Sequence, residues 1–157
     1  MNRRIADTRV GRWAVLALVA SVVLAGCATS RPPDLDPRIE AATAAFGGRF
    51  DYVYVPSEGR LADEAFVVIS RVTGPREIAR DLATLMAPAE TQPVRVMVTG
   101  PSGPKTLRVV VDALSYYEGR RIPHLELLYL GEPTHEAVLA REIAKVGAVL
   151  RFAPYQE

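Results

Sequence analysis

A glycine- and proline-rich loop with one lysine is the first stretch whose residue types could bind an anion. Residues 100–106 are Gly-Pro-Ser-Gly-Pro-Lys-Thr, and they lie between a predicted strand and a predicted helix. Backbone N–H groups and a lysine at such a place can hold phosphate. However, the spacing from Gly100 to Lys105 is one residue short of the phosphate-loop pattern, and Pro104 lacks an N–H group where that pattern has glycine. We therefore expect a turn and a helix start, with binding of a small anion as the alternative.

The histidines and serines have no catalytic spacing. His124 and His135 are the only histidines, and no H-x-x-H or H-E-x-x-H pattern occurs around them. We expect both on the solvated surface. Ser57 and Ser102 lie near glycines, but no G-x-S-x-G nucleophile turn is present. The sequence therefore predicts a protein that is not an enzyme, with no catalytic residue, no metal site and no cofactor.

Cys27 is the only cysteine, and it follows directly on an apolar run. Residues 1–12 carry four arginines and one aspartate, whereas residues 13–25 carry no charge. A membrane-spanning helix needs about 20 apolar residues, so this run is too short to span a bilayer. A basic segment, a short apolar run and small residues before the cysteine are typical of a secretory signal peptide.

The residues Leu24-Ala25-Gly26-Cys27 resemble the lipobox of bacterial lipoproteins. The resemblance implies cleavage between Gly26 and Cys27, a diacylglyceryl group on the Cys27 thiol, and usually acylation of the new amino terminus. Each buried CH₂ contributes about 0.8 kcal/mol, so two or three chains should anchor the protein stably to a membrane. The alternative is a secreted protein, or a protein with an N-terminal membrane anchor, in which the cysteine is incidental.

Ala28 stands where inner-membrane lipoproteins of enteric bacteria often carry aspartate. This difference favours the outer membrane over the inner one. Residues 28–35 form a polar tether with two prolines, and at about 3.3 Å per residue it extends at most ~25 to 30 Å. We therefore expect the folded part to stay close to the periplasmic side of its membrane.

Three segments divide the chain: a signal peptide (1–26), the lipidated cysteine with its tether (27–35), and a periplasmic domain (36–157). Removal of residues 1–26 leaves 131 residues, which suffice for one domain with a core of its own. The remaining 15 basic and 17 acidic residues give a net charge of −2. This charge balance lacks the excess of basic residues that is typical of nucleic-acid-binding proteins, so we expect no nucleic-acid partner. With Cys27 lipidated, no thiol remains for a disulfide.

The hydrophobic patterns predict an α/β domain with five strands and about four helices. Alternating or continuous apolar runs rich in β-branched residues indicate strands at 49–55, 65–72, 94–99, 125–130 and 148–153. Apolar residues at helical spacing, bounded by proline and glycine, indicate helices at 36–46, 74–87, 104–117 and 132–147. From Gly74 onward helices and strands alternate, which predicts a mostly parallel or mixed five-stranded sheet with right-handed crossovers. The first two strands are joined by a short loop and could be antiparallel.

In an open α/β sheet, ligands usually bind beyond the carboxyl ends of the strands. The residues that would line such a ligand crevice in this chain are Thr99, Gly100, Ser102, Lys105, Gly131 and Glu132. A small-ligand-binding module is therefore one alternative function.

The order of elements around residues 94–100 and 131–133 resembles that of the OmpA-like peptidoglycan-binding domain, which often occurs on lipoproteins. That family holds its ligand with an Asp shortly after the glycine and an Arg on the following helix. In this chain Pro101-Ser102 stands where that family has the Asp, and the helix lacks the N-x-x-L-S-x-x-R-A motif. The resemblance implies a degenerate peptidoglycan-associated domain as a further alternative.

Together these patterns favour a membrane-anchored envelope lipoprotein that acts as a non-enzymatic structural, adaptor or assembly component. Its partners would be the membrane, through the lipid on Cys27, and an envelope protein. A broad exposed apolar patch would favour this reading, whereas perturbed carboxylates gathered with His124 at the strand ends would favour a ligand-binding module or an enzyme.

Overall fold

The computed structural model of the chain describes residues 32, 34–74 and 76–155. Residues Asp34–Glu157 belong to one compact unit. The predicted signal peptide, its cleavage site at Gly26 and the lipidation site at Cys27 lie outside the described residues.

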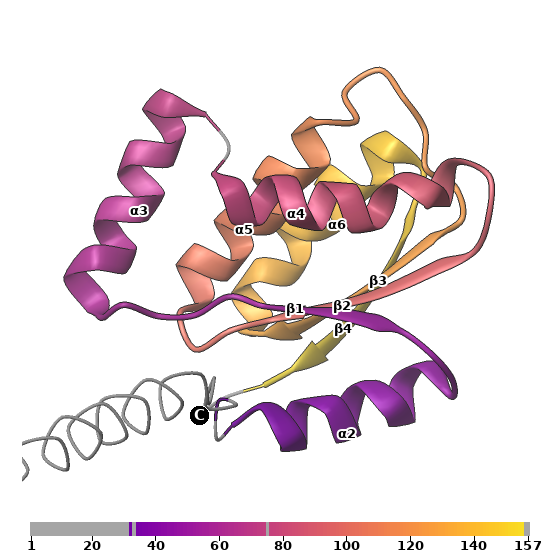
Figure 1. Cartoon of the computed structure of the whole chain (residues 1–157), viewed down its shortest axis with the longest axis horizontal. Coiled ribbons are helices and arrows are strands. Elements are labelled where there is room, and N and C mark those ends of the chain that lie inside the picture. The colour runs from indigo at the N-terminus through magenta and orange to yellow at the C-terminus, as the bar shows by residue number, and fades with distance from the viewer. Residues whose placement is uncertain (1–31, 33, 75, 156–157) are drawn as a thin grey trace, which may run out of the picture. The chain divides into compact units, whose positions relative to one another are not determined.

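A four-stranded, wholly parallel sheet forms the centre of this unit (Figure 1). Its strands are β1 (Asp51–Tyr54), β2 (Val94–Thr99), β3 (Leu125–Gly131) and β4 (Val149–Pro154). They lie side by side in chain order, and each pairs in parallel with the next. The α/β class is thus confirmed. The predictions of a fifth strand and of an antiparallel first pair are wrong for the described chain.

Five α-helices and two short 3₁₀ turns connect or cover the described strands, against the four helices expected. The helices are α2 (Leu35–Phe46), α3 (Arg60–Thr73), α4 (Glu77–Met86), α5 (Gly103–Ser115) and α6 (Glu136–Val146), and the turns are η1 (Ala87–Glu90) and η2 (Pro133–His135). Gly47 and Gly147 end α2 and α6 in the left-handed conformation that glycine adopts without strain.

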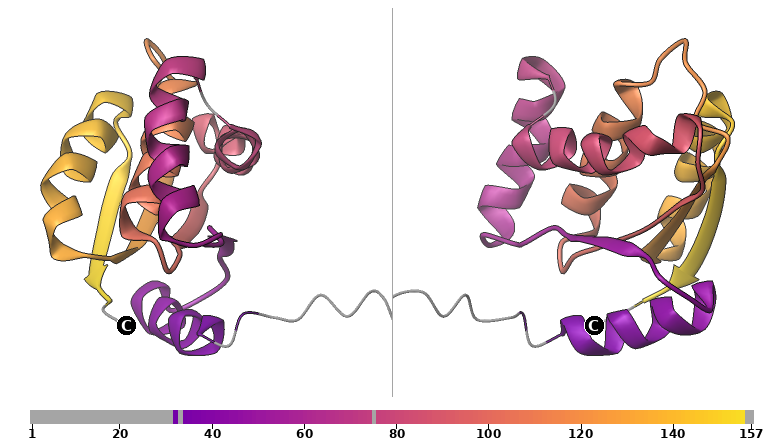
Figure 2. Two further views of the ribbon diagram at one scale, coloured as in Figure 1. Left: turned by 90° about the vertical axis from the view of Figure 1, so that its left-hand side faces the viewer. Right: turned by 45° about the vertical axis from the view of Figure 1, so that its right-hand side comes forward.

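The strand order explains why the connecting helices share one side of the sheet. When each right-handed crossover advances in the same direction, its helix packs on the same face every time. Helices α4, α5 and α6 accordingly cover one face, and α2 lies against the other (Figures 1 and 2).

Side chains alternate between the two faces along each central strand. On β2, Val96 and Val98 enter the larger core under α4, α5 and α6, whereas Met97 enters the smaller core under α2. On β3, Leu127 enters the larger core and Leu128 enters the smaller core. Both central strands are buried on both faces, which accounts for their nearly continuous apolar sequences.

The segment 65–72, predicted to be a strand, belongs to helix α3. Its continuous apolarity suggested burial on both faces, but no such burial occurs. In the whole of α3 only Asp63 and Ser70 are buried. Phe66 packs against the core and Val67 is half-buried. The other apolar residues follow the helical period and turn outward, because a buried polar side chain in the first turn sets the orientation of the helix.

Candidate functional site

The carboxyl ends of the strands form one edge of the sheet. Tyr54, Thr99 and Leu130 are neighbours in the register of β1, β2 and β3. The six residues predicted to line a ligand crevice lie on or beyond this edge, but the structure places them in separate settings.

Lys105, in the first turn of α5, points toward α3. Its Nζ donates hydrogen bonds to the Pro56 carbonyl oxygen at 2.8 Å and to Asp63 Oδ1 at 3.0 Å. The side chains of Lys105 and Asp63 are only 5% and 6% exposed, so this is a buried ion pair between two helices. Lys105, the lysine that could bind an anion according to the sequence, is therefore paired with the Asp63 carboxylate.

Asp63 accepts further hydrogen bonds at this point. Ser57 Oγ lies 2.6 Å from Asp63 Oδ2, and the Glu58 amide donates to Oδ1 at 3.2 Å. Burial alone would raise the pKa of Asp63, but the hydrogen bonds from Ser57, Lys105 and the Glu58 amide together lower this pKa below its ordinary value, and Ser102 adds to the effect. The carboxylate stays ionised and holds the start of α3 against α5.

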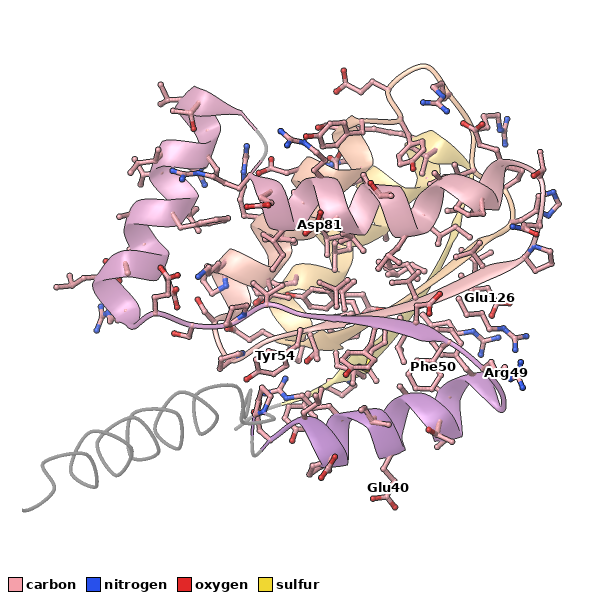
Figure 3. The ribbon with its side chains drawn as sticks, in the orientation of Figure 1. Glu40, Arg49, Phe50, Tyr54, Asp81 and Glu126 are labelled. Atoms are coloured by element: carbon pink, nitrogen blue, oxygen red, sulfur yellow. The ribbon has the colours of Figure 1, made fainter. Side chains whose placement is uncertain are left out.

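Thr99 faces the opposite side of the sheet. Its hydroxyl donates to the Leu130 carbonyl oxygen at 3.2 Å and accepts a hydrogen bond from Arg38 Nη1 at 2.5 Å. Arg38 is 1% exposed, and its guanidinium pairs with Asp34 at 2.9 Å and lies over the ring of Tyr155. Tyr54 completes the group by donating to Asp34 at 2.9 Å, and it is labelled near the start of α2 in Figure 3. This cluster joins α2 to the sheet.

Gly131 and Glu132 lie beside a buried tyrosine and histidine. Tyr129 Oη is 3.0 Å from His135 Nδ1, and a Cβ atom at Gly131 would clash with the Tyr129 ring. His135 is 8% exposed, so the prediction of a surface histidine is wrong for this residue, whereas His124 is exposed as predicted. Burial lowers the pKa of His135, and Glu132 partly opposes this effect.

Gly100 fills the space between β1 and α5. A Cβ atom here would clash with the Val55 carbonyl oxygen and would lie 2.7 Å from Thr106 Oγ1. Its position therefore requires glycine because the backbones approach closely.

An open hollow of about 630 Å³ lies beside the buried ion pair, between α3 and the loop that precedes α5. Arg60, Glu64 and Arg71 line it on the α3 side, and Pro101, Ser102 and Pro104 line it on the loop side. Asp63 also lines the hollow, and its carboxylate is already paired with Lys105.

Among residues 32, 34–74 and 76–155, no three His, Cys, Asp or Glu side chains gather closely enough to bind a metal ion. In the same ranges, no helix has the length and apolar character needed to span a membrane.

The most unusual feature of the described surface is the outward face of α3. Of the eight large apolar side chains that are exposed, four belong to this one helix. We call Leu61, Val68, Ile69 and Val72 the α3 outer stripe; they are 83%, 61%, 43% and 85% exposed. Residues Ala62 and Ala65 lie in the same stripe and are exposed as well. The helix thus turns its polar residues Asp63 and Ser70 inward and its aliphatic side chains outward.

This orientation is opposite to that of an ordinary surface helix, whose apolar side faces the core. Sequence analysis missed it because the stripe was assigned to a buried strand. The 4-3-4 spacing of Leu61, Ala65, Val68 and Val72, with Asp63 in the first turn, was the signal that could have revealed it.

Fold and site together define a parallel α/β protein whose strand-end polar groups pair internally and whose helix α3 presents an apolar face. No protein-family model, curated protein or solved structure matches the chain.

Proposed function

We propose that the chain is a lipid-anchored, non-enzymatic adaptor or assembly component of a bacterial cell envelope, and that it binds its partner through the α3 outer stripe. The observation that carries this proposal is the exposure of four aliphatic side chains along one face of a single helix. Contiguous apolar surface of this kind is typical of sites that bind another macromolecule.

The strand-end groups also favour an adaptor over an enzyme or a ligand-binding module. Asp63 and Lys105 neutralise each other, and Thr99 is hydrogen-bonded to Arg38 and to β3. These side chains are engaged in holding α2, α3 and α5 in place.

The proposed anchor is the lipid on Cys27, which the lipobox supports. The tether from Cys27 to Asp34 would keep the α3 outer stripe within about 25 Å plus the width of the domain from the membrane. A partner would therefore be another component of the same membrane or of the periplasm next to it.

A photo-crosslinking amino acid at Val72 of the full chain, in intact membranes, tests this function. We expect a discrete covalent adduct from Val72 and none from the same probe at Glu40. Glu40 is an exposed residue of α2 that points away from the domain (Figure 3). If Val72 gives no adduct while the protein is folded and membrane-bound, the docking role of α3 is contradicted.

A further inference from the structure

We propose that the occupant of the α3 outer stripe is the same stripe of a second copy of this chain, packed antiparallel about a two-fold axis. This inference rests on the proposed function and names the partner at its docking face. The spacing of the stripe, its charges and the direction in which the helix faces support this pairing.

Three residues of the stripe, together with Ala65, have the spacing of a coiled-coil seam. Leu61, Ala65, Val68 and Val72 are separated by four, three and four residues, which places them at alternating d and a positions of two heptads. Asp63 and Ser70 then fall at f positions, on the side of the helix farthest from the seam. These two are the buried residues that hold α3 to its own domain.

The seam is complementary to itself when two helices run antiparallel. Antiparallel pairing joins a positions of one helix to d positions of the other. Leu61 then contacts Val72 of the second copy, and Ala65 contacts Val68 of the second copy. The two-fold axis repeats each contact with the two copies exchanged. The small Ala65 side chains lie near the two-fold axis and allow the helices to approach closely.

The charges beside the seam are complementary in the same register. Glu64 and Arg71 occupy the two g positions, and antiparallel packing brings each g position to the g position of the other helix. Each Glu64 thus faces Arg71 of the second copy, which gives two ion pairs related by the axis. A parallel arrangement would not bring these two g residues together.

Both side chains are available for such pairs. Among residues 34–74 and 76–155, Arg71 takes part in none of the ion pairs that the structure forms. Glu64 pairs only with Arg60 on its own helix at 2.9 Å, and these side chains are 59% and 90% exposed. An exposed i,i+4 pair contributes little, so Glu64 can exchange it for Arg71 of the second copy.

The geometry of the domain leaves room for a second copy. Because the f positions point into the domain, the seam points away from it, and the two domains would lie on opposite sides of the paired helices. Helix α3 stands at the left-hand edge of the domain in Figure 1 and faces the viewer in the left view of Figure 2. The pairing is isologous, as in most two-fold homodimers.

A seam of two heptads is short for a dimer that is stable in dilute solution. Such dimers usually bury about 1,200 to 2,000 Å². We therefore expect association that rises with protein concentration. Anchoring both copies in one membrane raises their effective concentration and so favours pairing.

Two charge variants test the pairing through their mixture. In Glu64→Arg both g positions are positive, and in Arg71→Glu both are negative, so each variant should self-associate about tenfold more weakly than the wild type. Mixed together, the two variants have opposite charges at every contact and should form heterodimers as strong as the wild-type dimer. The measurement is sedimentation equilibrium of the full-length lipidated protein in detergent, over a range of concentrations.

Cysteine pairs test the direction of the helices in the same preparations. A mixture of Leu61→Cys and Val72→Cys should form a disulfide between copies, whereas Leu61→Cys alone should not, because antiparallel packing places the two Leu61 positions at opposite ends of the seam. Lipidation of Cys27, the only native cysteine, leaves the introduced thiols as the reactive ones.

Three results would overturn the inference. They are a wild-type protein that stays monomeric at all concentrations, a mixture of charge variants no stronger than either variant alone, and crosslinking of Leu61→Cys with itself as fast as the mixed pair. A Val72 photo-adduct with the mass of a different protein would overturn this inference and leave the proposed function standing. An absence of any adduct would contradict both.

Discussion

Lys105 and Asp63 determine how α3 is attached to the rest of the domain. The ion pair is almost fully buried, and the carboxylate also accepts hydrogen bonds from Ser57 and the Glu58 amide. Removing one partner of a buried pair leaves an uncompensated charge, which is more costly than replacing both. The pair therefore controls both the stability of the α3 start and the direction in which the outer stripe faces.

Substitution Lys105→Met should lower the free energy of unfolding by about 3 kcal/mol, because Asp63 stays buried without its cation. The double variant Lys105→Met/Asp63→Leu should recover part of this loss. Urea unfolding measures both effects. The matched control is Arg60→Met, which breaks an exposed ion pair on the same helix and should leave the free energy of unfolding nearly unchanged. Equal costs for Lys105→Met and Arg60→Met would contradict the structural role of the buried pair.

His135 should make the domain less stable in mild acid. Burial lowers the pKa of this side chain below its ordinary value of 6.5, so the folded protein keeps it neutral at a pH where the unfolded chain takes up a proton. The stability that His135 contributes is fully present above about pH 6.5 and is lost as the pH falls through the folded-state pKa.

The measurement is the unfolding free energy of wild type and His135→Gln between about pH 7.5 and 5. The variant should show a flatter pH dependence than the wild type over the lower part of this range. His124→Gln, which alters an exposed histidine, should keep the wild-type slope. If His135→Gln keeps the pH dependence of the wild type, His135 is not the group that makes the domain less stable in mild acid.

Among the elements, α3 differs from every other described helix in what it buries. Helices α4, α5 and α6 each turn several apolar residues into the core, whereas α3 buries only two polar residues. Its link to the domain rests on the Lys105 pair, on Phe66 against the core, and on a 3.2 Å hydrogen bond from Arg108 to the Ser70 carbonyl oxygen.

If the outer stripe is exposed in the monomer, polar substitutions there should not unfold it. Leu61→Gln and Val72→Gln should each change the unfolding free energy by about 0.5 kcal/mol or less at low protein concentration. Leu82→Ala, at a fully buried position of α4, should cost about 3 kcal/mol in the same assay. A cost for Leu61→Gln as large as that for Leu82→Ala would show that the apolar side of α3 is buried in the core.

The elements also show what sequence patterns could and could not predict. Strands β2 and β3 were correctly placed because their apolar runs are short and bounded by turn residues. Helix α3 was missed because β-branched residues in a continuous run predict a buried strand, and the pattern does not say which side faces water. The pairing of Asp63 with Lys105 spans 42 residues, and the contact of Tyr129 with His135 depends on the turn η2. Such tertiary contacts leave no local spacing in the sequence.

At the scale of the whole molecule, a small parallel α/β domain combines a proposed lipid anchor with an apolar helix face. The proposed anchor would confine the domain to a layer beside the membrane, and confinement strengthens weak contacts between neighbours. In that arrangement a short seam would suffice, because both partners would be held in one plane.

Cys27→Ser should move the protein from the membrane to the soluble fraction, because the thiol that would receive the lipid is gone. Fractionation and labelling with a radioactive fatty acid measure this directly. Retention of Cys27→Ser in the membrane, together with no fatty-acid uptake by the wild type, would contradict the anchor.

The central claim is that the α3 outer stripe is covered in the membrane-bound protein although the isolated domain exposes it. The most direct measurement is the rate at which a maleimide reacts with Val72→Cys in native membranes, compared with Glu40→Cys, since both positions are exposed in the structure. We predict that Val72→Cys reacts several-fold more slowly than Glu40→Cys in membranes and that dilution in detergent removes the difference. Equal rates in membranes would contradict the claim.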